Sequence, residues 1–365
     1  MTPTPRPGIL DISPYVGGES ATAGPGRAIR LASNENPLGP GTRAVAAFAT
    51  VREDLHRYPD GAATVLRAAI GEAEGLDPAR IVCGAGSDEL ISMLVRAYAG
   101  PGDEVLHSEH GFLMYALAAK SAGATPIAAP EQNLTTDVEA VLARAGAQTR
   151  LVFLANPNNP TGSYLDGAAL RRLRAGLPDH VLLVIDAAYA EYVTVDDYES
   201  GAALVDEFDN VVMTRTFSKI HGLAALRLGW AYCPAAVADV LNRIRGPFNV
   251  CQPALAAGVA ALNDRAHVER SRRHNARWRA WLAEQLADLG LQAYPSVGNF
   301  LLVRFPTEEA HAAPAALSFL KENGILVRGM AVYGLPECLR ITIGDEADTR
   351  DLATALARFM AGRAA

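Results

Sequence analysis

The stretch VVMTRTFSK at residues 211–219 decides how this sequence is interpreted. Residues 211–214 are mostly apolar and predict a strand, and Lys219 follows just past the end of that strand. A lysine there points into the cleft where α/β sheets bind their ligands, and it can form a Schiff base with a carbonyl. Ser218 and Arg227 add donors suited to a phosphate. Taken alone, a solvated loop lysine at 219 and a surface ion pair at Arg227 are the more common explanations.

Short apolar strands alternate with helices on both sides of this stretch. The other expected strands are 81–83, 104–107, 151–154, 181–185 and 228–232. Two of them, 151–154 and 181–185, are continuously apolar, as strands covered on both faces are. Between them, residues such as 88–99 carry the apolar periodicity of a helix. The alternation predicts an α/β fold with a mostly parallel sheet flanked by helices, and ligands at the carboxyl ends of its strands.

Asp186 closes one expected strand, 181–185, and Tyr189 follows three residues later. A carboxylate at the end of a buried strand is costly unless it has a partner, and a protonated ring nitrogen would be one. Tyr189 would add a hydroxyl. The alternative is a structural aspartate that caps the start of a helix.

The segment NPNNPTG at residues 156–162 follows the strand expected over 151–154. Its two prolines and its glycine fix a tight turn that presents the Asn159 amide rigidly. The alternative is a plain turn, because Asn-Pro pairs are common in turns.

The segment CGAGSDE at residues 83–89 lies between an expected strand and an expected helix. Its glycines let the backbone approach an anion, and the N-terminus of the following helix favours negative charge. The pattern completes neither G-x-x-x-x-G-K-[ST] nor G-x-G-x-x-G, so a nucleotide-binding fold is not supported.

All these segments lie at strand-to-loop junctions on one edge of the predicted sheet. Together they supply an amine, a buried carboxylate, a phenol, an amide and a phosphate cradle, which is the set that pyridoxal 5′-phosphate requires. The expected contacts are the aldehyde with Lys219, the ring nitrogen with Asp186, the phenolate oxygen with Asn159 and Tyr189, and the phosphate with Ser87, Ser218 and Arg227.

The chain resembles the fold-type I pyridoxal-phosphate-dependent aminotransferases, and among these most closely the histidinol-phosphate aminotransferases. The matching segments are SNENPLG at 33–39, RYPD at 57–60, GSDE at 86–89, NPNNPTG at 156–162, DAAY at 186–189, TFSK at 216–219, GLAALRLGW at 222–230 and CLRITIG at 338–344. The resemblance runs almost end to end. It implies a large domain with a mostly parallel seven-stranded sheet flanked by helices, and a smaller α+β domain.

Three parts of the chain are expected on this basis. Residues 1–40, dense in glycine and proline, form an arm that packs with the small domain and with a partner subunit. Residues 41–240 form the large cofactor-binding domain, and residues 241–365 form the small domain.

The resemblance also implies residue roles. Lys219 binds the cofactor and later shuttles a proton, Asp186 keeps the pyridine nitrogen protonated, and Phe112 stacks on the ring. Tyr58 reaches the cofactor phosphate of a neighbouring subunit, which implies a homodimer with shared active sites. Arg340 holds the anionic group of the substrate. The complete set expected at the cofactor is Gly86, Ser87, Asp88, Phe112, Asn159, Asp186, Tyr189, Ser218, Lys219 and Arg227, together with Tyr58.

The sequence departs from the family pattern at two places. The family often has a tyrosine where Phe112 stands and a Pro-Thr pair where His110 and Gly111 stand. Stacking survives this change, but a hydroxyl role does not. The usual D-E-A-Y is D-A-A-Y here, with Ala187 in place of the glutamate, and the spacing of Asp186 and Tyr189 is kept.

The substrate end of the site is expected at Arg340, with Arg328 as the second candidate and Tyr15 from the arm as the third. Two arginines and a phenol suit a phosphate monoester better than a lone carboxylate. The alternative for Arg328 is an ordinary arginine at a strand end. Asn34 either lines the imidazole end of the substrate or forms a turn of the arm.

The leading hypothesis is a transaminase that converts L-histidinol phosphate and 2-oxoglutarate to imidazole acetol phosphate and L-glutamate in histidine biosynthesis. The alternatives are an aromatic amino acid aminotransferase and an enzyme like the threonine-phosphate decarboxylases. A scaffold that binds pyridoxal phosphate without catalysis is a further alternative, against which the intact set of Lys219, Asp186 and Arg227 argues.

Charge and composition restrict the partners. With 33 Lys and Arg against 40 Asp and Glu, the net charge is −7, so no nucleic-acid partner and no anionic membrane is expected. The four cysteines are scattered without metal-ligand spacing, so no metal is expected.

The uncharged residues 246–263 include two prolines and indicate a packed helix rather than a membrane span. The first eight residues lack the apolar core of a signal peptide, and the expected location is the cytoplasm.

Overall fold

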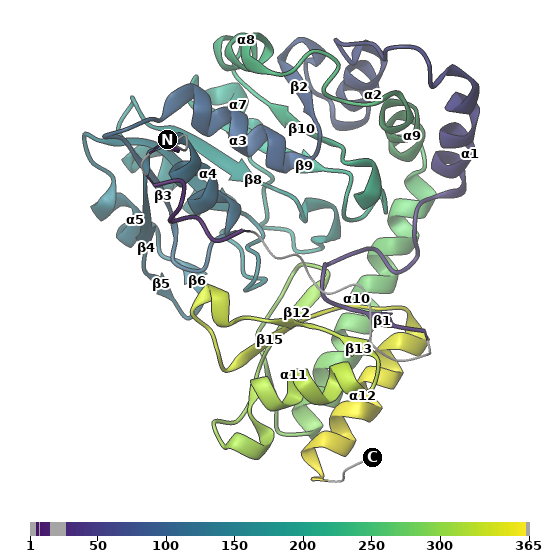
Figure 1. The fold of residues 1–365 in the computed structure, drawn as a ribbon. Coiled ribbons are helices and arrows are strands. Elements are labelled where there is room, and N and C mark those ends of the chain that lie inside the picture. The colour runs from purple at the N-terminus through teal and green to yellow at the C-terminus, as the bar shows by residue number, and fades with distance from the viewer. Residues whose placement is uncertain (1–4, 7, 15–26, 363–365) are drawn as a thin grey trace, which may run out of the picture.

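The structure, a computed structural model, describes residues 5–6, 8–14 and 27–362. The chain forms a larger α/β part, drawn in the upper half of Figure 1, and a smaller part below it. The long helix α10 (Arg265–Asp288) leads from the first to the second. Tyr15 lies outside the described residues.

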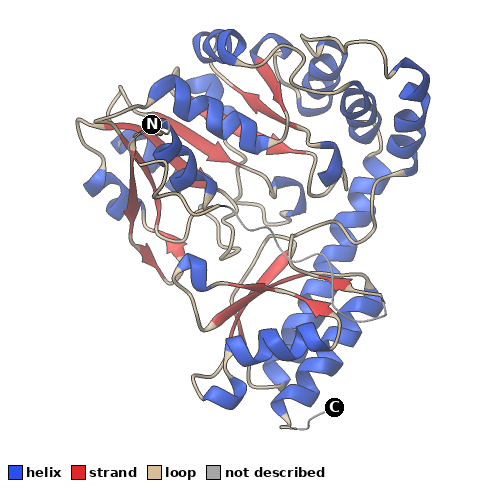
Figure 2. Cartoon of the chain, in the orientation of Figure 1, coloured by secondary structure: helices blue, strands red, loops and turns tan. Residues whose placement is uncertain are grey.

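A seven-stranded sheet forms the centre of the larger part, which confirms the predicted fold class. Its strands, in spatial order, are β2 (Ile81–Gly84), β10 (Gly229–Tyr232), β9 (Val211–Thr216), β8 (Leu182–Asp186), β7 (Thr149–Ala155), β3 (Glu104–Ser108) and β4 (Thr125–Ala129). Strand β10 runs antiparallel to both its neighbours, and the remaining pairs are parallel. Parallel strands need crossover helices, and Figure 2 shows these helices on both faces of the sheet.

Each face of the sheet has its own apolar core, because successive side chains of a strand point to opposite faces. In β7, Leu151 and Phe153 belong to one core, and Val152 and Leu154 to the other. The first core is completed by α3 (Ser87–Tyr98), α4 (Met114–Ala122) and α8 (Ala235–Ile244). The second is completed by α1 (Thr42–Thr50), α2 (Thr64–Glu74), α5 (Val138–Arg144), α6 (Gly167–Gly176), α7 (Ala202–Glu207) and α9 (Gln252–Leu262).

The smaller part is built on an antiparallel sheet whose strand order is β11, β12, β15, β14. Its strands are β11 (Gln292–Ala293), β12 (Phe300–Arg304), β15 (Cys338–Thr342) and β14 (Arg328–Gly329). Helices α10, α11 (Ala313–Glu322) and α12 (Glu346–Met360) cover it. The arm joins this part: β1 (Ile29–Arg30) pairs in parallel with β13 (Ile325–Leu326), and Leu31 is buried in the same core.

Helix α9 follows residue 240 in the chain but packs in the core of the larger part. Its residues Ala254, Leu255 and Ala257 are buried there with Leu66 of α2 and Leu228. Figure 1 shows α9 beside α1. A boundary at residues 240 and 241 stays a prediction, and this packing associates α9 with the larger part.

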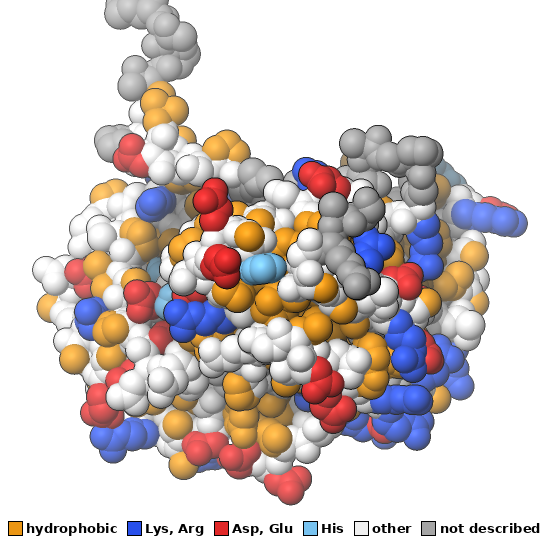
Figure 3. All heavy atoms as spheres, turned by 90° about the horizontal axis from the view of Figure 1, so that it is seen from below, with side chains coloured by type: hydrophobic (Ala, Val, Ile, Leu, Met, Phe, Trp, Pro, Cys, Tyr) orange, Lys and Arg blue, Asp and Glu red, His pale blue; other side chains and the backbone are white. Residues whose placement is uncertain are grey.

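The surface of the smaller part carries mixed charge. On the face seen from below, acidic and basic side chains are interspersed with apolar ones (Figure 3), which is typical of a solvated protein surface. Within the described part of the chain, none of the helices is both long enough and apolar enough to cross a membrane.

Candidate active site

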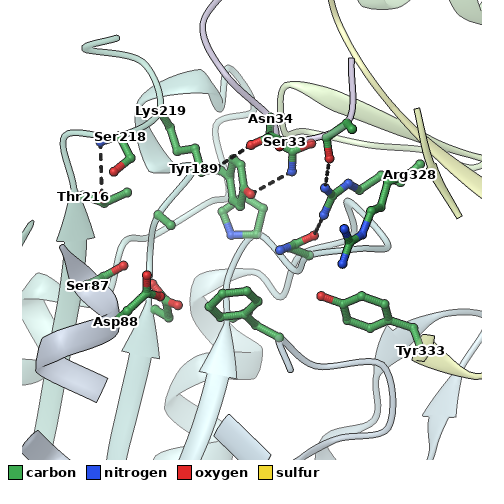
Figure 4. Close-up of a pocket in the computed structure, with 18 of the residues that line it drawn as sticks. Ser33, Asn34, Ser87, Asp88, Tyr189, Thr216, Ser218, Lys219, Arg328 and Tyr333 are labelled. Atoms are coloured by element: carbon green, nitrogen blue, oxygen red, sulfur yellow. Dashed lines mark hydrogen bonds between the residues drawn. The ribbon is translucent and has the colours of Figure 1, made fainter. Parts of the chain in front are cut away.

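A cavity lies where the carboxyl ends of the central strands face the smaller part and the arm. The strand register brings these ends together, because Ala155 is paired with Asp186 and Asp186 with Thr214. Most of the predicted site residues line the cavity: Asn34, Ser87, Asp88, Phe112, Asn159, Asp186, Tyr189, Ser218, Lys219, Arg227, Arg328 and Arg340. Figure 4 shows Ser87, Asp88 and Ser218 on one side of this cavity and Arg328 and Tyr333 on the other.

Two predicted site residues with described positions do not line the cavity. Gly86 is not part of the lining and packs against the Arg227 guanidinium, which does line the cavity. Tyr58 is 83% exposed and stacks on Phe248, with ring centroids 4.6 Å apart. Its predicted contact with the cofactor of a neighbouring subunit stays a prediction.

Lys219 follows β9 and extends into the cavity. Its Nζ donates to the Ser33 carbonyl oxygen at 3.2 Å and lies 5.6 Å from the centre of the Tyr189 ring. Burial, assisted by the positive charge of Arg340, lowers the pKa of the Lys219 amine to about 8. A substantial fraction of this amine is therefore neutral near pH 8, and a neutral amine is the form that attacks a carbonyl.

Asp186 ends β8 and is buried in the floor of the cavity. One carboxylate oxygen accepts a hydrogen bond from the Tyr115 hydroxyl at 2.9 Å, and the other accepts one from the Thr214 hydroxyl at 3.1 Å. Burial raises the pKa of this carboxyl to about 6, although both hydrogen bonds act in the opposite direction. A cation beside it would stabilise the charged form further.

An anion cradle forms one end of the cavity. Ser87 begins helix α3, whose first backbone N–H groups have no acceptor within the helix. Arg227 Nη1 donates to the Ser218 hydroxyl at 3.2 Å, and Arg227 Nη2 pairs with Asp88 at 3.1 Å. Gly86 has φ 84°, and a Cβ there would lie 2.5 Å from the Arg227 guanidinium, so the cradle closes only around a glycine.

The amide and the phenol that were predicted to share one oxygen of the cofactor both line the cavity. Asn34 Nδ2 donates to the Tyr189 hydroxyl at 2.9 Å, and Asn34 is itself buried. Asn159 Oδ1 accepts a hydrogen bond from Arg340 Nη1. Asn34 therefore positions Tyr189 whether or not it also contacts substrate.

The two arginines at the other end come from paired strands. Arg328 of β14 and Arg340 of β15 are directly opposite each other in the antiparallel register, so their side chains project from the same face of the sheet. Arg340 is buried, its Nη2 donates to the Ala32 carbonyl oxygen at 2.7 Å, and its guanidinium lies 5.5 Å from the Phe300 ring centre.

Sequence reasoning missed several residues of the site. Tyr115 and Thr214 contact Asp186, Tyr333 lines the cavity, and the carbonyl oxygens of Ala32 and Ser33 hold Arg340 and Lys219. The sequence did contain a signal for Tyr115, because this residue lies three positions after Phe112 and therefore about one helical turn away.

The donor set fits pyridoxal 5′-phosphate. The cavity combines a partly neutral amine at Lys219 and a buried carboxyl at Asp186 with an anion cradle that excludes any side chain at Gly86. The aldehyde, ring nitrogen and phosphate of this cofactor require these three groups in one cavity.

Comparison with known proteins gives the same assignment. The family described as "Aminotransferase class I and II" matches residues 27–356. A histidinol-phosphate aminotransferase of Rhodospirillum centenum is 61% identical over 360 residues, covering 99% of each chain. Another, from Paramagnetospirillum magneticum, is 58% identical over 358 residues, covering 98% of this chain and 99% of the relative.

A solved structure of histidinol-phosphate aminotransferase from Sinorhizobium meliloti, in complex with pyridoxal 5′-phosphate, superposes with a TM-score of 0.89. The two sequences are 30% identical, and the match covers 98% of this chain and 97% of the other. The chain belongs to the class I and II aminotransferase family and is a pyridoxal-phosphate-dependent aminotransferase.

Proposed function

We propose that this enzyme transfers the amino group of L-histidinol phosphate to 2-oxoglutarate, giving imidazole acetol phosphate and L-glutamate in histidine biosynthesis. The observation that carries the proposal is the pair of Arg328 and Arg340, placed across from each other at the end of the cavity opposite the anion cradle. Two guanidinium groups suit a phosphate dianion, and either can also pair with a carboxylate of the second substrate. The full-length relatives named above support the same reaction.

The cofactor is held by residues near the strand ends that face the cavity. Ser87 at the start of α3, Ser218 and Arg227 bind its phosphate, and Asp88 orients Arg227 through their ion pair. Asp186 pairs with the ring nitrogen, and Phe112 packs against the ring. When bound, pyridoxal 5′-phosphate supplies an aldehyde and a ring that withdraws electrons from the carbon that loses a proton.

Lys219 moves the proton. Its lowered pKa allows the amine to accept a proton near neutral pH and to release it again within the same turnover. Tyr189 and Asn159 bind the phenolate oxygen of the cofactor, and Asn34 keeps the Tyr189 hydroxyl directed into the cavity. Arg340 holds the anionic group of either substrate close to Lys219.

The enzyme acts as a homodimer with shared active sites. Large apolar side chains are exposed on and around α1, η1 (Val51–Asp54) and α2: Val45, Phe48, Leu55, Tyr58, Val65 and Phe248. Exposed apolar surface of this kind is typical of a protein interface. Tyr58 belongs to this set, so a partner that covers the surface receives the Tyr58 side chain, in agreement with its predicted contact across the interface.

The location is the cytoplasm. The four cysteines Cys83, Cys233, Cys251 and Cys338 are free thiols, which suits a reducing compartment. The substrates of the proposed reaction are small charged metabolites.

Turnover of L-histidinol phosphate and of L-phenylalanine, each with 2-oxoglutarate, tests the proposed reaction. The expected result is a kcat/KM at least tenfold higher for L-histidinol phosphate, because only this substrate offers a phosphate to both arginines. Arg328→Gln should lower kcat/KM for L-histidinol phosphate by tenfold or more and change that for phenylalanine little. Equal or faster turnover of phenylalanine would favour the aromatic aminotransferase, and release of carbon dioxide from threonine phosphate would favour the decarboxylase.

A further inference from the structure

The Tyr115 hydroxyl is buried beneath the candidate active site, where it forms a hydrogen bond with Asp186. Tyr115 has no exposed surface, belongs to helix α4 and lies in the core that α3, α4 and α8 complete. Its hydroxyl donates to Asp186 Oδ2 at 2.9 Å. Because a hydroxyl in an apolar core is costly without a partner, the contact with Asp186 explains why a tyrosine is tolerated there.

The ring of Tyr115 is fixed on two sides. It stacks on Phe153 of β7, with ring centroids 4.7 Å apart and an interplanar angle of 9°. It also meets Phe112 edge-on, at 5.8 Å and 89°, and its centroid lies 6.4 Å from that of the His107 ring. The hydroxyl position is therefore set by the sheet core and by the ring that lines the cavity, and it leaves Asp186 little freedom to rotate.

Tyr115 and Thr214 divide the carboxylate between them. Thr214 donates to Oδ1 at 3.1 Å, so each oxygen of Asp186 accepts one hydroxyl hydrogen bond and keeps a further lone pair for a ligand. Burial opposes the charge on Asp186, and both hydroxyls favour it. Burial also raises the pKa of Tyr115 well above its usual value, so the phenol remains a donor at every working pH.

Other charged groups also face Asp186. The positive charge of Lys219 favours the ionised carboxylate, and the negative charge of Asp88 opposes it. The buried phenols of Tyr189 and Tyr198 also lie within electrostatic range of Asp186 and remain neutral. Among the hydrogen bonds that favour the ionised carboxylate, the one from Tyr115 lowers the pKa of Asp186 most.

We propose that Tyr115 is a positioning residue for the cofactor, because its hydroxyl orients Asp186 and keeps it ionised to bind the protonated ring nitrogen. The proposal rests on the assigned cofactor and not on the identity of the substrate. Tyr115 itself touches neither of them, so its effect must pass through the nitrogen of the ring.

Tyr115→Phe tests this, because the variant keeps the aromatic stack and removes the hydroxyl. The measurement is the dissociation constant of the cofactor-free enzyme for pyridoxal 5′-phosphate and for its 1-deaza analogue, in which a C–H group replaces the ring nitrogen. We expect roughly tenfold weaker binding of pyridoxal 5′-phosphate, the usual effect of losing one hydrogen bond to a charged group. Binding of the analogue should change by less than about twofold, because it offers no nitrogen to Asp186.

Tyr232→Phe is the matched control. Tyr232 is also buried and donates to a carboxylate, Asp206, at 2.6 Å, but it does not line the cavity. It should change neither dissociation constant. If Tyr115→Phe does not fold, Thr214→Val removes the other donor and should produce the same selective loss.

The pH dependence gives a second measurement. Loss of a donor to the carboxylate raises the pKa of Asp186, so the variant should lose affinity for pyridoxal 5′-phosphate at a higher pH than the wild type as the solution is acidified. Equally weakened binding of both ligands, or an unshifted pH dependence of pyridoxal 5′-phosphate binding, would overturn the proposal and leave Tyr115 a structural residue. A wrong substrate assignment would leave all these binding constants unchanged and would be detected only by turnover.

Discussion

Asp186 carries a conflict between stability and catalysis. Burial raises the pKa of its carboxyl from 3.8 to about 6 in the folded chain. Below pH 4 the carboxyl is protonated in both the folded and the unfolded chain, and above pH 6 it is ionised in both. Between these values the unfolded chain ionises first, so the stability of the cofactor-free protein falls as the pH rises from about 4 to 6.

Replacement of this charge should therefore stabilise the protein and inactivate it. We expect Asp186→Asn to raise the free energy of unfolding of the cofactor-free protein at pH 7.5, by up to about 3 kcal/mol. Transamination should fall by a factor of one hundred or more, because an amide cannot neutralise a protonated ring nitrogen. Urea denaturation and turnover measure the two effects. A variant that is less stable and still active would contradict this account of Asp186.

The Lys219 amine should set the pH dependence of cofactor capture. Because its pKa is lowered to about 8, the rate at which cofactor-free enzyme captures pyridoxal 5′-phosphate should rise from pH 6.5 and level off above about pH 8.5. Stopped-flow absorbance measures this rate. A rate that keeps rising through pH 10 would mean that the amine behaves like a solvated lysine.

Several residues at strand ends could be predicted from order along the chain, whereas two residues inside elements were missed. Lys219, Asp186 and Asn159 each follow an apolar run, so their position at the sheet edge is readable from order along the chain. Thr214 lies within β9 and Tyr115 within α4, where a polar side chain looks like any other member of the element. Their contact with Asp186 depends on the register of β8 with β9 and on the packing of α4.

At the scale of elements, one ion pair ties the loop after β3 to the hairpin of β5 (Glu131–Gln132) and β6 (Thr135–Thr136). His110 Nδ1 lies 2.9 Å from Glu131 Oε2, and the His110 backbone N–H donates to the other oxygen at 3.2 Å. The hydrogen bond to Glu131 raises the pKa of His110. The same loop continues to Phe112, so the pair anchors a wall of the cavity.

Glu131→Gln should lower stability most at acidic pH. A raised histidine pKa contributes stability that is complete below the unfolded value of about 6.5 and is lost as the pH rises through the folded pKa. We expect a loss of about 1 kcal/mol at pH 5.5 and a smaller loss at pH 8.5, measured by chemical denaturation.

The control for this prediction is Glu308→Gln. Glu308 pairs with His311 at 3.8 Å, and its side chain is 75% exposed, so the substitution should have little effect at either pH. If Glu131→Gln lowers stability equally at pH 5.5 and pH 8.5, the charged pair with His110 is excluded as the cause.

Most elements of the central sheet were predicted, and the errors have physical reasons. Strand β4 was missed because it is a short edge strand of mixed exposure that contains Pro126. The sequence TDVE at 136–139 has the pattern of a capping box with Thr136 as the cap, but Asp137 caps α5 by accepting from the N–H groups of Glu139 and Ala140. Thr136 belongs to β6 instead, because strand pairing with Glu131 takes precedence over a local cap.

At the scale of the whole molecule, contacts between distant segments complete the site. The arm pairs with the smaller part through Ile29 and Ile325, and this brings the Ser33 carbonyl to Lys219 and Asn34 to Tyr189. The family resemblance implied a large and a small domain. The family resemblance implied that the arm packs with the small domain, but the strand pairing of Ile29 with Ile325 could not be predicted, because nothing local marks residues nearly 300 positions apart as partners.

The exposed apolar surface around α1 should hold the homodimer together. Phe48 is 47% exposed there, and a charge in a buried interface is costly. We expect Phe48→Glu to shift the enzyme from dimer to monomer in light scattering and to weaken cofactor binding, because the Tyr58 contact across the interface is lost. Val195→Glu, at an exposed apolar residue elsewhere, should leave the dimer intact. A monomeric, fully active wild type would contradict the shared active site.

We propose that one amine, that of Lys219, holds the cofactor in the cavity that also contains the buried Asp186. The chain contains three lysines, Lys120, Lys219 and Lys321, so chemical labelling can identify the amine that binds the cofactor. The enzyme is incubated with pyridoxal 5′-phosphate, reduced with borohydride, digested and examined by mass spectrometry. The account predicts the reduced pyridoxyl group on the peptide that contains Lys219, and none on Lys219→Arg under the same conditions. Stable modification at Lys120 or Lys321, or at no lysine, would contradict it.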